Sequence, residues 1–379
     1  MIFRSFWINQ IRKAWLKRPI VWLSGVRRVG KTTIAKMFED AVYLNCDLPS
    51  VVRMLADPET YYDSMQENAV IVFDEVHRLE DPSRLLKIAA DAYPHLRILA
   101  TGSSTLAATQ KFRDSLTGRK HTIYLPPVLW SECRDVFNIK DLDHRLLHGG
   151  LPEPLLSKEK DELFFPEWLD SFYARDIQEL FGIRNRVGFM KLLHLLLRQS
   201  GGLLDYTNLA KLSDLSRQTV KAHIEAMSVA HAVFCLPPFH GGSRREITKR
   251  LKCYGFDTGV VCFMNGWDSI RETDRGLLWE HLVLDTLRTN INDSNLYYWR
   301  DKSGREIDFV IKDRANRCHA IECKISPNHF EPKSLFVFRS HYPHGDNFVI
   351  SPSLKIPYKH QYNNLTVTFC SVATFPLIG

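Results

Sequence analysis

Residues 25–33, with the sequence GVRRVGKTT, have the types and spacing of a loop that binds phosphate. Gly25 and Gly30 let successive backbone N–H groups wrap phosphate oxygens, and the N-terminus of the next helix adds positive potential. In this pattern Lys31 reaches the β- and γ-phosphates, and the hydroxyl of Thr32, which Thr33 follows, binds Mg²⁺. The spacing therefore predicts a nucleoside-triphosphate site with Mg²⁺ as its metal.

The acidic pair Asp74 and Glu75 follows an apolar run at residues 69–73. A carboxylate at the end of such a strand, here Asp74, can hold Mg²⁺ through water, and Glu75 is placed to orient or deprotonate an attacking water molecule. The alternative is an acidic turn after a buried strand, which the phosphate loop upstream disfavours. We therefore expect Lys31 and Glu75 to take part in triphosphate hydrolysis.

Polar and basic residues after a further apolar run, residues 97–100, could complete the nucleotide site. Thr101 or Ser103 could hydrogen-bond the γ-phosphate or the attacking water, the role called sensor 1, although a turn at the end of the strand explains either residue equally well. Arg113 or Arg119 could contribute charge to the γ-phosphate of a neighbouring subunit, as an arginine finger does. The alternative is two solvated surface arginines, and the sequence leaves both interpretations open.

Two other classes of nucleotide-dependent protein fit less well. The sequence DEVH at residues 74–77 also spells a helicase motif, but residues 140–262 have a helical pattern rather than the alternating pattern of a second sheet domain. The sequence NKxD, which GTPases use to read guanine, is absent from the chain. Both observations argue for a different kind of NTPase.

The spacing of apolar residues predicts the elements that must position these groups. Runs at residues 20–23, 69–73 and 97–100 alternate with stretches of helical periodicity, among them TTIAKMFEDA at 32–41. Such alternation predicts an α/β domain with a parallel sheet covered on both faces. Residues 140–200 are mostly helical in pattern, and the chain after residue 270 has a helix followed by strands.

Residues 203–214 and 216–230 predict two helices joined by a short turn, with Ser216 as the cap of the second helix. Four side chains of the second helix are expected to point outward, where they could meet DNA: Arg217, Gln218, Lys221 and His223. Five basic residues are expected on the hairpin that follows, at the place of a wing: Arg244, Arg245, Lys249, Arg250 and Lys252. Winged helices also serve as protein-docking or lid modules, so DNA contact and protein docking both remain open.

A second set of charged residues lies in the last hundred residues. Glu280 falls on a predicted helix and Asp308 on the strand EIDFVI, while Glu322 and Lys324 alternate in the strand AIECKI and so point to one side. The three carboxylates could bind Mg²⁺, and Lys324 could stabilise an attacked phosphate or a hydroxide nucleophile. Charges that interrupt apolar strands favour such a nuclease-like centre, and an inactive core used for binding or assembly is the alternative.

The composition is that of a globular protein. The chain has 379 residues, which predicts two or three domains, and its 45% hydrophobic content excludes a disordered or collagen-like protein. Its 50 Lys and Arg residues exceed its 43 Asp and Glu residues, which gives a net charge of +7. This mild excess permits contact with nucleic acid without requiring it.

No apolar run approaches the roughly 18 residues that span a bilayer, and basic residues interrupt the N-terminal segment where a signal peptide would be apolar. Phe3, Trp7, Ile11 and Trp15 recur every four residues, which predicts a docked amphipathic helix. None of the eight cysteines forms a CxxC pair. We therefore expect a cytoplasmic protein with free thiols, no membrane partner and no structural zinc.

Several segments resemble, in order and spacing, a family of prokaryotic AAA-type ATPases joined to a C-terminal domain of unknown function: GVRRVGKTT, VIVFDEVHRL, RILATGSST and LTGRKHTIYLPPVLWSE. Later segments are similar too, so the resemblance covers nearly the whole chain: HGGLPEPLL, YARDIQELF, LLDYTNLAKL, CYGFDTGVV, RGLLWEHLV and REIDFVI. The resemblance implies ATP as the nucleotide, a helical lid, a winged helix and a restriction-endonuclease-like core. In a core of the D-(E/D)xK type, Glu280 matches the acid of the first helix.

We therefore expect an α/β protein with four parts: an AAA-type P-loop ATPase domain (1–135), a helical lid (136–200), a winged helix-turn-helix (201–268) and a restriction-endonuclease-like α/β domain (269–379). The expected function is an ATPase that uses Mg²⁺ and acts on DNA through the winged helix and a metal-dependent nuclease-like centre. The alternative is an ATP-driven switch that binds protein partners and carries an inert nuclease-like domain. A homo-oligomer is expected if Arg113 or Arg119 acts between subunits.

Overall fold

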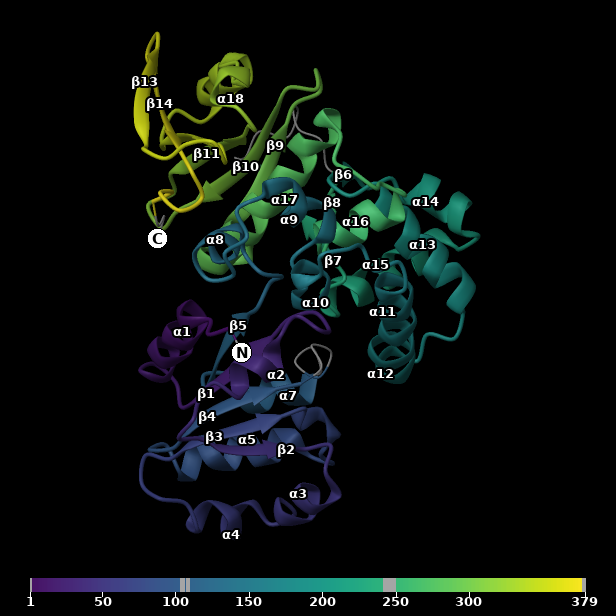
Figure 1. The fold of residues 1–379 in the computed structure, drawn as a ribbon, viewed down its shortest axis with the longest axis vertical. Coiled ribbons are helices and arrows are strands. Elements are labelled where there is room, and N and C mark those ends of the chain that lie inside the picture. Colours follow the sequence, from purple (N-terminus) through teal and green to yellow (C-terminus); the bar gives the residue numbers. More distant parts are fainter. Residues whose placement is uncertain (1, 103–105, 107–109, 241–249, 377–379) are drawn as a thin grey trace. The chain divides into compact units, whose positions relative to one another are not determined.

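A computed structural model describes residues 2–102, 106, 110–240 and 250–376, and the chain forms two compact units (Figure 1). The first unit consists of Met1–Pro126, Pro166–Arg184 and Val229–His231, and the second of Pro127–Phe165, Asn185–Ser228 and Ala232–Gly379. Part of the expected lid, residues 166–184, therefore folds with the N-terminal unit, and the rest of the lid folds with the second unit.

The first unit is built on a five-stranded sheet in the order β2-β3-β4-β1-β5. Its strands are β1 (Ile20–Ser24), β2 (Val42–Asn45), β3 (Val70–Asp74), β4 (Arg97–Thr101) and β5 (Lys120–Tyr124). Every neighbouring pair is parallel, which confirms the predicted parallel sheet. All strands therefore end at the same edge, and the loops that follow β1, β3 and β4 meet there.

Short helices connect and cover these strands (Figure 1). They are α1 (Ser5–Trp15), α2 (Lys31–Ala35), α3 (Pro49–Met54), α4 (Pro58–Asp63), η1 (Val76–Arg78), α5 (Pro82–Ala92) and α7 (Gln110–Leu116). A later segment of the chain adds α11 (Phe164–Phe172), the π-helix η2 (Tyr173–Gln178) and α12 (Glu179–Phe181). The helix expected over 32–41 is only five residues long, and the chain leaves the helix after Ala35.

Helix α1 packs through the face that the sequence predicts. Trp7, Ile11 and Trp15 are buried, and the Trp15 indole N–H donates to the carbonyl of Ile98 in β4 (2.9 Å). Phe3, the first residue of the pattern, is 57% exposed and precedes the helix. The docked helix is therefore confirmed, with one position fewer than predicted.

The second unit contains a helical part and a small antiparallel sheet in the order β6-β8-β7. Its helices are α8 (Trp130–Asp135), α9 (Leu142–His148), α10 (Pro152–Leu156), α13 (Arg186–Arg198), α14 (Tyr206–Ser213), α15 (Arg217–Val229) and α16 (Thr258–Met264). Its strands are β6 (Gly202–Leu203), β7 (Val233–Leu236) and β8 (Lys252–Gly255). The two predicted helices of the helix-turn-helix are thus present as α14 and α15, although Val229, the last residue of α15, groups with the first unit.

A six-stranded mixed sheet in the order β13-β14-β12-β11-β10-β9 completes the second unit. Its strands are β9 (Leu296–Arg300), β10 (Glu306–Lys312), β11 (Cys318–Cys323), β12 (Asn347–Ile350), β13 (Tyr358–Tyr362) and β14 (Leu365–Cys370). The helices are α17 (Glu272–Asn290), η3 (Asp293–Asn295), η4 (Pro327–His329) and α18 (Lys333–His341). Strands β9, β10 and β11 form an antiparallel meander, and β12 joins β11 and β14 in parallel.

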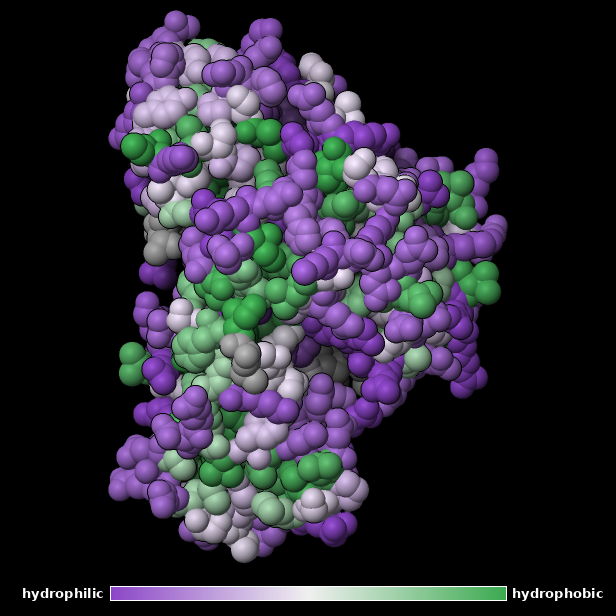
Figure 2. Space-filling view, viewed as in Figure 1, coloured by the Kyte–Doolittle hydropathy of each residue, from purple (hydrophilic) through white to green (hydrophobic). Residues whose placement is uncertain are grey.

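The described surface is mainly hydrophilic, but Figure 2 shows apolar side chains over β2 and α3. Val42, Val52 and Met54 in these elements are between 37% and 53% exposed. None of the helices within the described residues combines the length and the apolar character needed to cross a membrane.

The segments HGGLPEPLL and CYGFDTGVV, which belong to the family resemblance described above, are hydrogen-bonded to each other inside the second unit. The Asp257 carboxylate accepts hydrogen bonds from the backbone N–H groups of Gly150 (2.7 Å) and Gly259 (2.6 Å). Gly149 adopts a positive φ of 81°, and a Cβ there would lie 1.8 Å from an Asp257 oxygen. Gly149 is required because the buried carboxylate approaches its backbone too closely for a side chain, whereas a Cβ on Gly150 would meet the Arg145 side chain and one on Gly259 the His148 carbonyl.

Replacing Gly149 with alanine should therefore destabilise the second unit by about 3 kcal/mol, from the positive φ together with the clash. Gly266 is a matched control, since it has a φ of 65° in the same unit but no atom within 4 Å of a built Cβ. G266A should cost only about 1 kcal/mol. Urea denaturation followed by circular dichroism measures both changes, and equal losses would show that the Asp257 contact does not constrain Gly149.

Candidate functional site

The phosphate loop begins directly after β1, as its sequence predicts. Gly25 and Gly30 have φ values of 155° and 100°, and a Cβ on Gly25 would lie 2.5 Å from the carbonyl oxygen of Leu125. The loop therefore turns sharply beside the chain that follows β5, and α2 begins at Lys31. This arrangement presents backbone N–H groups and a helix N-terminus at the carboxyl edge of the sheet.

Lys31 folds back on its own loop. Its ammonium donates to the carbonyl oxygens of Gly25 (2.9 Å) and Val26 (3.1 Å). Burial lowers the pKa of Lys31, and the negative charge of Glu75 opposes this effect. Thr32 and Thr33 follow in the first turn of α2. The loop thus holds a positive charge where the pattern predicts the β- and γ-phosphates.

Asp74 is fixed at the end of β3 by two hydroxyl groups. The Tyr43 hydroxyl donates to one carboxylate oxygen (2.6 Å), and the Thr101 hydroxyl donates to the other. Thr101 also accepts a hydrogen bond from the backbone N–H of Glu75 (3.1 Å). Thr101 therefore orients the acidic pair, whereas the sequence predicted contact with phosphate or water. The other sensor candidate, Ser103, lies outside the described residues.

Glu75 has a left-handed backbone conformation with a φ of 55°, which is uncommon for a residue with a side chain. Its carboxylate lies 3.3 Å from Nδ1 of His77. Burial raises the pKa of Glu75, while the positive charge of Lys31 opposes this rise. Strained residues of this kind are concentrated at functional sites, where the surrounding contacts hold them.

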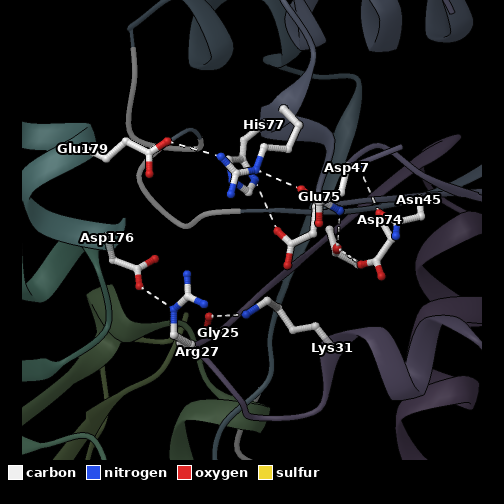
Figure 3. Close-up of polar contacts among 12 residues, drawn as sticks. Gly25, Arg27, Lys31, Asn45, Asp47, Asp74, Glu75, His77, Asp176 and Glu179 are labelled. Carbon is white, nitrogen blue, oxygen red and sulfur yellow. Dashed lines mark hydrogen bonds and ion pairs between the residues drawn. The ribbon is translucent and has the colours of Figure 1, made fainter. Parts of the chain in front are cut away.

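The helical segment 166–184 contributes two acids to this edge of the sheet (Figure 3). Asp176 in η2 accepts from the Nε of Arg27 in the phosphate loop (2.9 Å). Glu179 in α12 pairs with Arg78 (3.3 Å), which also pairs with Asp47 (3.0 Å). These partners of the loop come from a distant part of the sequence, and sequence analysis did not find them.

The two candidate arginine fingers, Arg113 and Arg119, lie in or next to α7 and β5 of the first unit. Arg119 forms two hydrogen bonds with Asp91, of 2.5 and 2.9 Å, and precedes the first residue of β5. Because β5 is parallel to β1, Arg119 lies at the amino edge of the sheet, opposite the phosphate loop. Arg113 is exposed on α7. Within one subunit Arg119 is therefore remote from the nucleotide site.

His231, a residue of the short segment that packs with the first unit, reaches the strand that carries the loop. Its Nε2 lies 2.8 Å from the Ser24 hydroxyl, and its ring packs on Tyr124 (4.9 Å between centroids). Ser24 directly precedes Gly25, so this contact supports the start of the phosphate loop.

Comparisons with known proteins agree with this geometry. Residues 17–134 match a family described as "AAA domain". Residues 17–134 form an AAA-type P-loop domain. Residues 139–271 and 275–370 match two families described as domains of unknown function, DUF8612 and DUF4143.

The chain is also similar to whole proteins. An uncharacterized protein of Mycobacterium tuberculosis is 26% identical over 326 residues, which cover 83% of this chain and 72% of that protein. An uncharacterized protein of Methanocaldococcus jannaschii is 25% identical, with 76% of this chain and 70% of that protein covered. Among solved structures, a Walker-type ATPase of Pyrococcus abyssi is 16% identical with a TM-score of 0.45, and covers 70% of this chain and 96% of its own.

In the second unit, the predicted charged residues come together around Asp308. The pairing of Phe309 with Ile321 places Asp308 beside Glu322, and an irregularity in the pairing of β9 with β10 falls between Ile307 and Val310. Bulges of this kind re-aim side chains and are common next to active sites. Lys324 contacts Glu322 (2.8 Å) and lies 4.0 Å from Asp308.

A cavity of about 350 Å³ opens beside these residues and is lined by Glu280, Asp308 and Lys324 among others. Burial, with the Asp308 charge adding, raises the pKa of Glu322 to about 8, and burial with the Glu280 charge raises the pKa of Asp308 to about 6. A divalent cation would relieve this repulsion, and two carboxylates with water suffice for Mg²⁺. The described residues contain no group of three or more acidic, His or Cys side chains arranged to hold a metal.

Lys252 is the main correction to the sequence analysis in this unit. It was expected on the exposed wing, but it is buried and donates to Glu280 (2.7 Å) and Glu306 (2.6 Å). Tyr254, two residues later on the same face of β8, donates to the same oxygen of Glu280. The alternation of Lys252 and Tyr254 in a short strand was the one local feature that could have indicated that Lys252 is buried. Its two glutamate partners lie far away in the sequence.

The outward orientation predicted for four side chains of α15 is found for three of them. Ser216 caps α15 by accepting from the Thr219 N–H (3.0 Å), and three of the four predicted side chains are exposed: Arg217, Gln218 and Lys221. The prediction for His223 is wrong, because its side chain is buried against Phe189. Arg250 is exposed and pairs with Asp205 (3.3 Å). Arg244, Arg245 and Lys249 lie outside the described residues.

The contact of Tyr43 with Asp74 predicts a role in holding Mg²⁺ with nucleotide. Y43F removes one of the two donors that fix Asp74, and a hydrogen bond to a charged group contributes about 1.5 kcal/mol or more. The Mg²⁺ concentration for half-maximal binding of a fluorescent ATP analogue should therefore rise about tenfold. Y93F removes a similar bond, from Tyr93 to the exposed Asp63 (2.6 Å), and should change nothing. Equal Mg²⁺ dependence in both variants would contradict a positioning role for Tyr43.

Proposed function

We propose that this chain is an ATP-hydrolysing enzyme that acts on DNA through a winged helix and a metal-dependent nuclease-like centre. The observation that carries the proposal is the assembly of Lys31, Asp74 and Glu75 at one edge of the parallel sheet, beside a loop whose glycines leave its amides open. Magnesium bound there would neutralise charge on the β- and γ-phosphates and orient them.

The chain's own residues supply the remaining chemistry of hydrolysis. Among the described residues, the Lys31 ammonium bonds to the backbone carbonyls of Gly25 and Val26, which incoming phosphate oxygens can replace. Asp74 is oriented by its two hydroxyl donors, and Glu75 has a raised pKa that suits a group taking a proton from water. These groups bind, orient and accept a proton without a rearrangement of the sheet.

Exposed basic side chains and the buried acids support action on DNA. Arg217 and Lys221 lie on the exposed side of α15, the second helix of the pair, as in helices that enter the major groove. Asp308, Glu322 and Lys324 match the types and spacing that bind a metal ion and an attacked phosphate. The alternative, a switch that binds protein partners through an inert core, predicts ATP turnover without any cleavage.

The first test concerns ATP. K31A should abolish binding of Mg²⁺–ATP measured by titration calorimetry, because the phosphates lose their main positive partner. E75Q should retain binding but lower phosphate release by about a hundredfold or more, because it cannot accept the water proton. E67Q, at an exposed position of the same unit, is the control. Hydrolysis by E75Q at the parental rate would refute the role of Glu75.

The second test concerns cleavage. With Mn²⁺ or Mg²⁺ and ATP, the protein should cleave at least one member of a panel of duplex, single-stranded and branched DNA and RNA substrates. E322Q should lower the cleavage rate by at least about a hundredfold, whereas E331Q, at an exposed position of the same unit, should not. An intact panel, together with ATP turnover, would favour the protein-binding switch.

A further inference from the structure

The side chain of Arg27 in the phosphate loop is held by Asp176, a residue outside the loop. Arg27 follows Val26, whose carbonyl oxygen accepts a hydrogen bond from the Lys31 ammonium. The backbone nitrogen of Arg27 is bonded directly to that carbonyl carbon. Figure 3 shows the guanidinium on the same side of the loop as the Lys31 ammonium and Glu75. Its charge acts on both of these groups. Arg27 therefore lies at the end of the loop where the γ-phosphate would bind.

The guanidinium is only partly engaged. Its Nε donates to Asp176 (2.9 Å), and within the described part of the chain no protein group contacts its two terminal nitrogens. The side chain is 28% exposed. An arginine that is anchored at Nε still presents a pair of N–H donors, which is the arrangement that binds phosphate oxygens best.

The helical segment that holds Arg27 is itself fixed to the nucleotide site at several points. The Trp168 indole N–H donates to the backbone carbonyl of Arg27 (3.1 Å), and Glu179 pairs with Arg78. Asp176 lies in the π-helix η2, a rare conformation that is frequent at functional sites. These contacts determine where the guanidinium can go.

We propose that Arg27 is a catalytic arginine that acts on the γ-phosphate of the nucleotide bound in its own subunit, and that Asp176 is its positioning residue. The inference rests on the proposed ATPase function. In the reaction the water oxygen bonds to the γ-phosphorus, the bond to the β–γ bridging oxygen breaks, and the electron pair leaves on ADP. The water proton passes to Glu75. Arg27 offsets the charge that develops on the γ-phosphate and bridging oxygens, a role that Arg119, at the opposite edge of the sheet, cannot fill within one subunit.

The first experiment measures kcat and ATP affinity separately. R27Q should lower kcat by at least about a hundredfold with less than about a threefold change in the Kd of Mg²⁺–ATP. R27K, which keeps the charge but loses the paired donors, should fall between R27Q and the parent. R53Q, at an exposed position of α3 in the same unit, is the charge-matched control and should match the parent. A kcat of R27Q within threefold of the parent would overturn the proposal.

Asp176 gives a test that a loss of folding cannot imitate. D176N removes the anchor of Arg27 and also a negative charge near the phosphates. We therefore expect kcat to fall about tenfold while ATP binds about threefold more tightly. Weaker ATP binding together with a lower kcat would contradict a positioning role and would indicate a structural one.

Mixing two inactive variants decides whether Arg27 acts within its own subunit. R27Q keeps Lys31, and K31A keeps Arg27, so an arginine that acts between subunits would restore activity in the mixture. We expect no activity above the sum of the separate variants, and a parental turnover per chain that does not depend on protein concentration. Restored activity would overturn the proposal. If the parent neither binds nor hydrolyses ATP, the proposed ATPase function fails instead.

Discussion

The parallel pairing of β1, β3 and β4 is the constraint on which the nucleotide site depends. Parallel strands end at one edge, so three loops that are far apart in the sequence must meet there. The hydrogen bond from Thr101 to Asp74 joins the ends of β4 and β3, and the phosphate loop follows the end of β1. The acidic pair and the lysine are brought together by the sheet, and the flexible side chains only complete the arrangement.

Ion pairs between basic and acidic side chains stabilise this edge of the sheet. Arg27 and Lys31 lie in the phosphate loop, and Arg78 lies in η1. Acids from separate parts of the chain pair with the two arginines. Asp176 and Glu179 come from the helical segment 166–184, which packs with the first unit although the chain before and after it belongs to the second. Ion pairs near a phosphate site are easily exchanged for contacts with phosphate, because both partners compete for the same donors. The segment therefore lies beside the candidate nucleotide site and pairs with its basic residues.

Buried charged side chains in the second unit have different surroundings and therefore different roles. Asp257 is buried and accepts two backbone N–H bonds, so its place in a glycine-rich segment is structural. Asp308 and Glu322 are also largely buried, but they lie close to each other beside a cavity and share Lys324. Lys252, in the neighbouring small sheet, forms ion pairs with both Glu280 and Glu306. Burial alone therefore does not distinguish these acids, and Asp308 and Glu322 differ from Asp257 because they lie close to each other beside a cavity.

The sequence by itself determined the phosphate loop, the strands β1, β3 and β4 of the parallel sheet, the acidic pair and the charged residues Asp308 and Glu322 of β10 and β11. These features are local, because turn glycines, apolar runs and alternation in a strand need only neighbouring residues. Only the tertiary structure decided that Lys252 is buried rather than exposed, that His223 faces inward, and that Tyr43 and Asp176 reach the nucleotide site. Each of these depends on contacts between residues that lie far apart in the chain, and no short pattern encodes a partner 30 or 150 residues away. The tertiary structure also decided at which edge of the sheet Arg119 lies. That edge follows from the direction of β5 beside β1, which the sequence does not give.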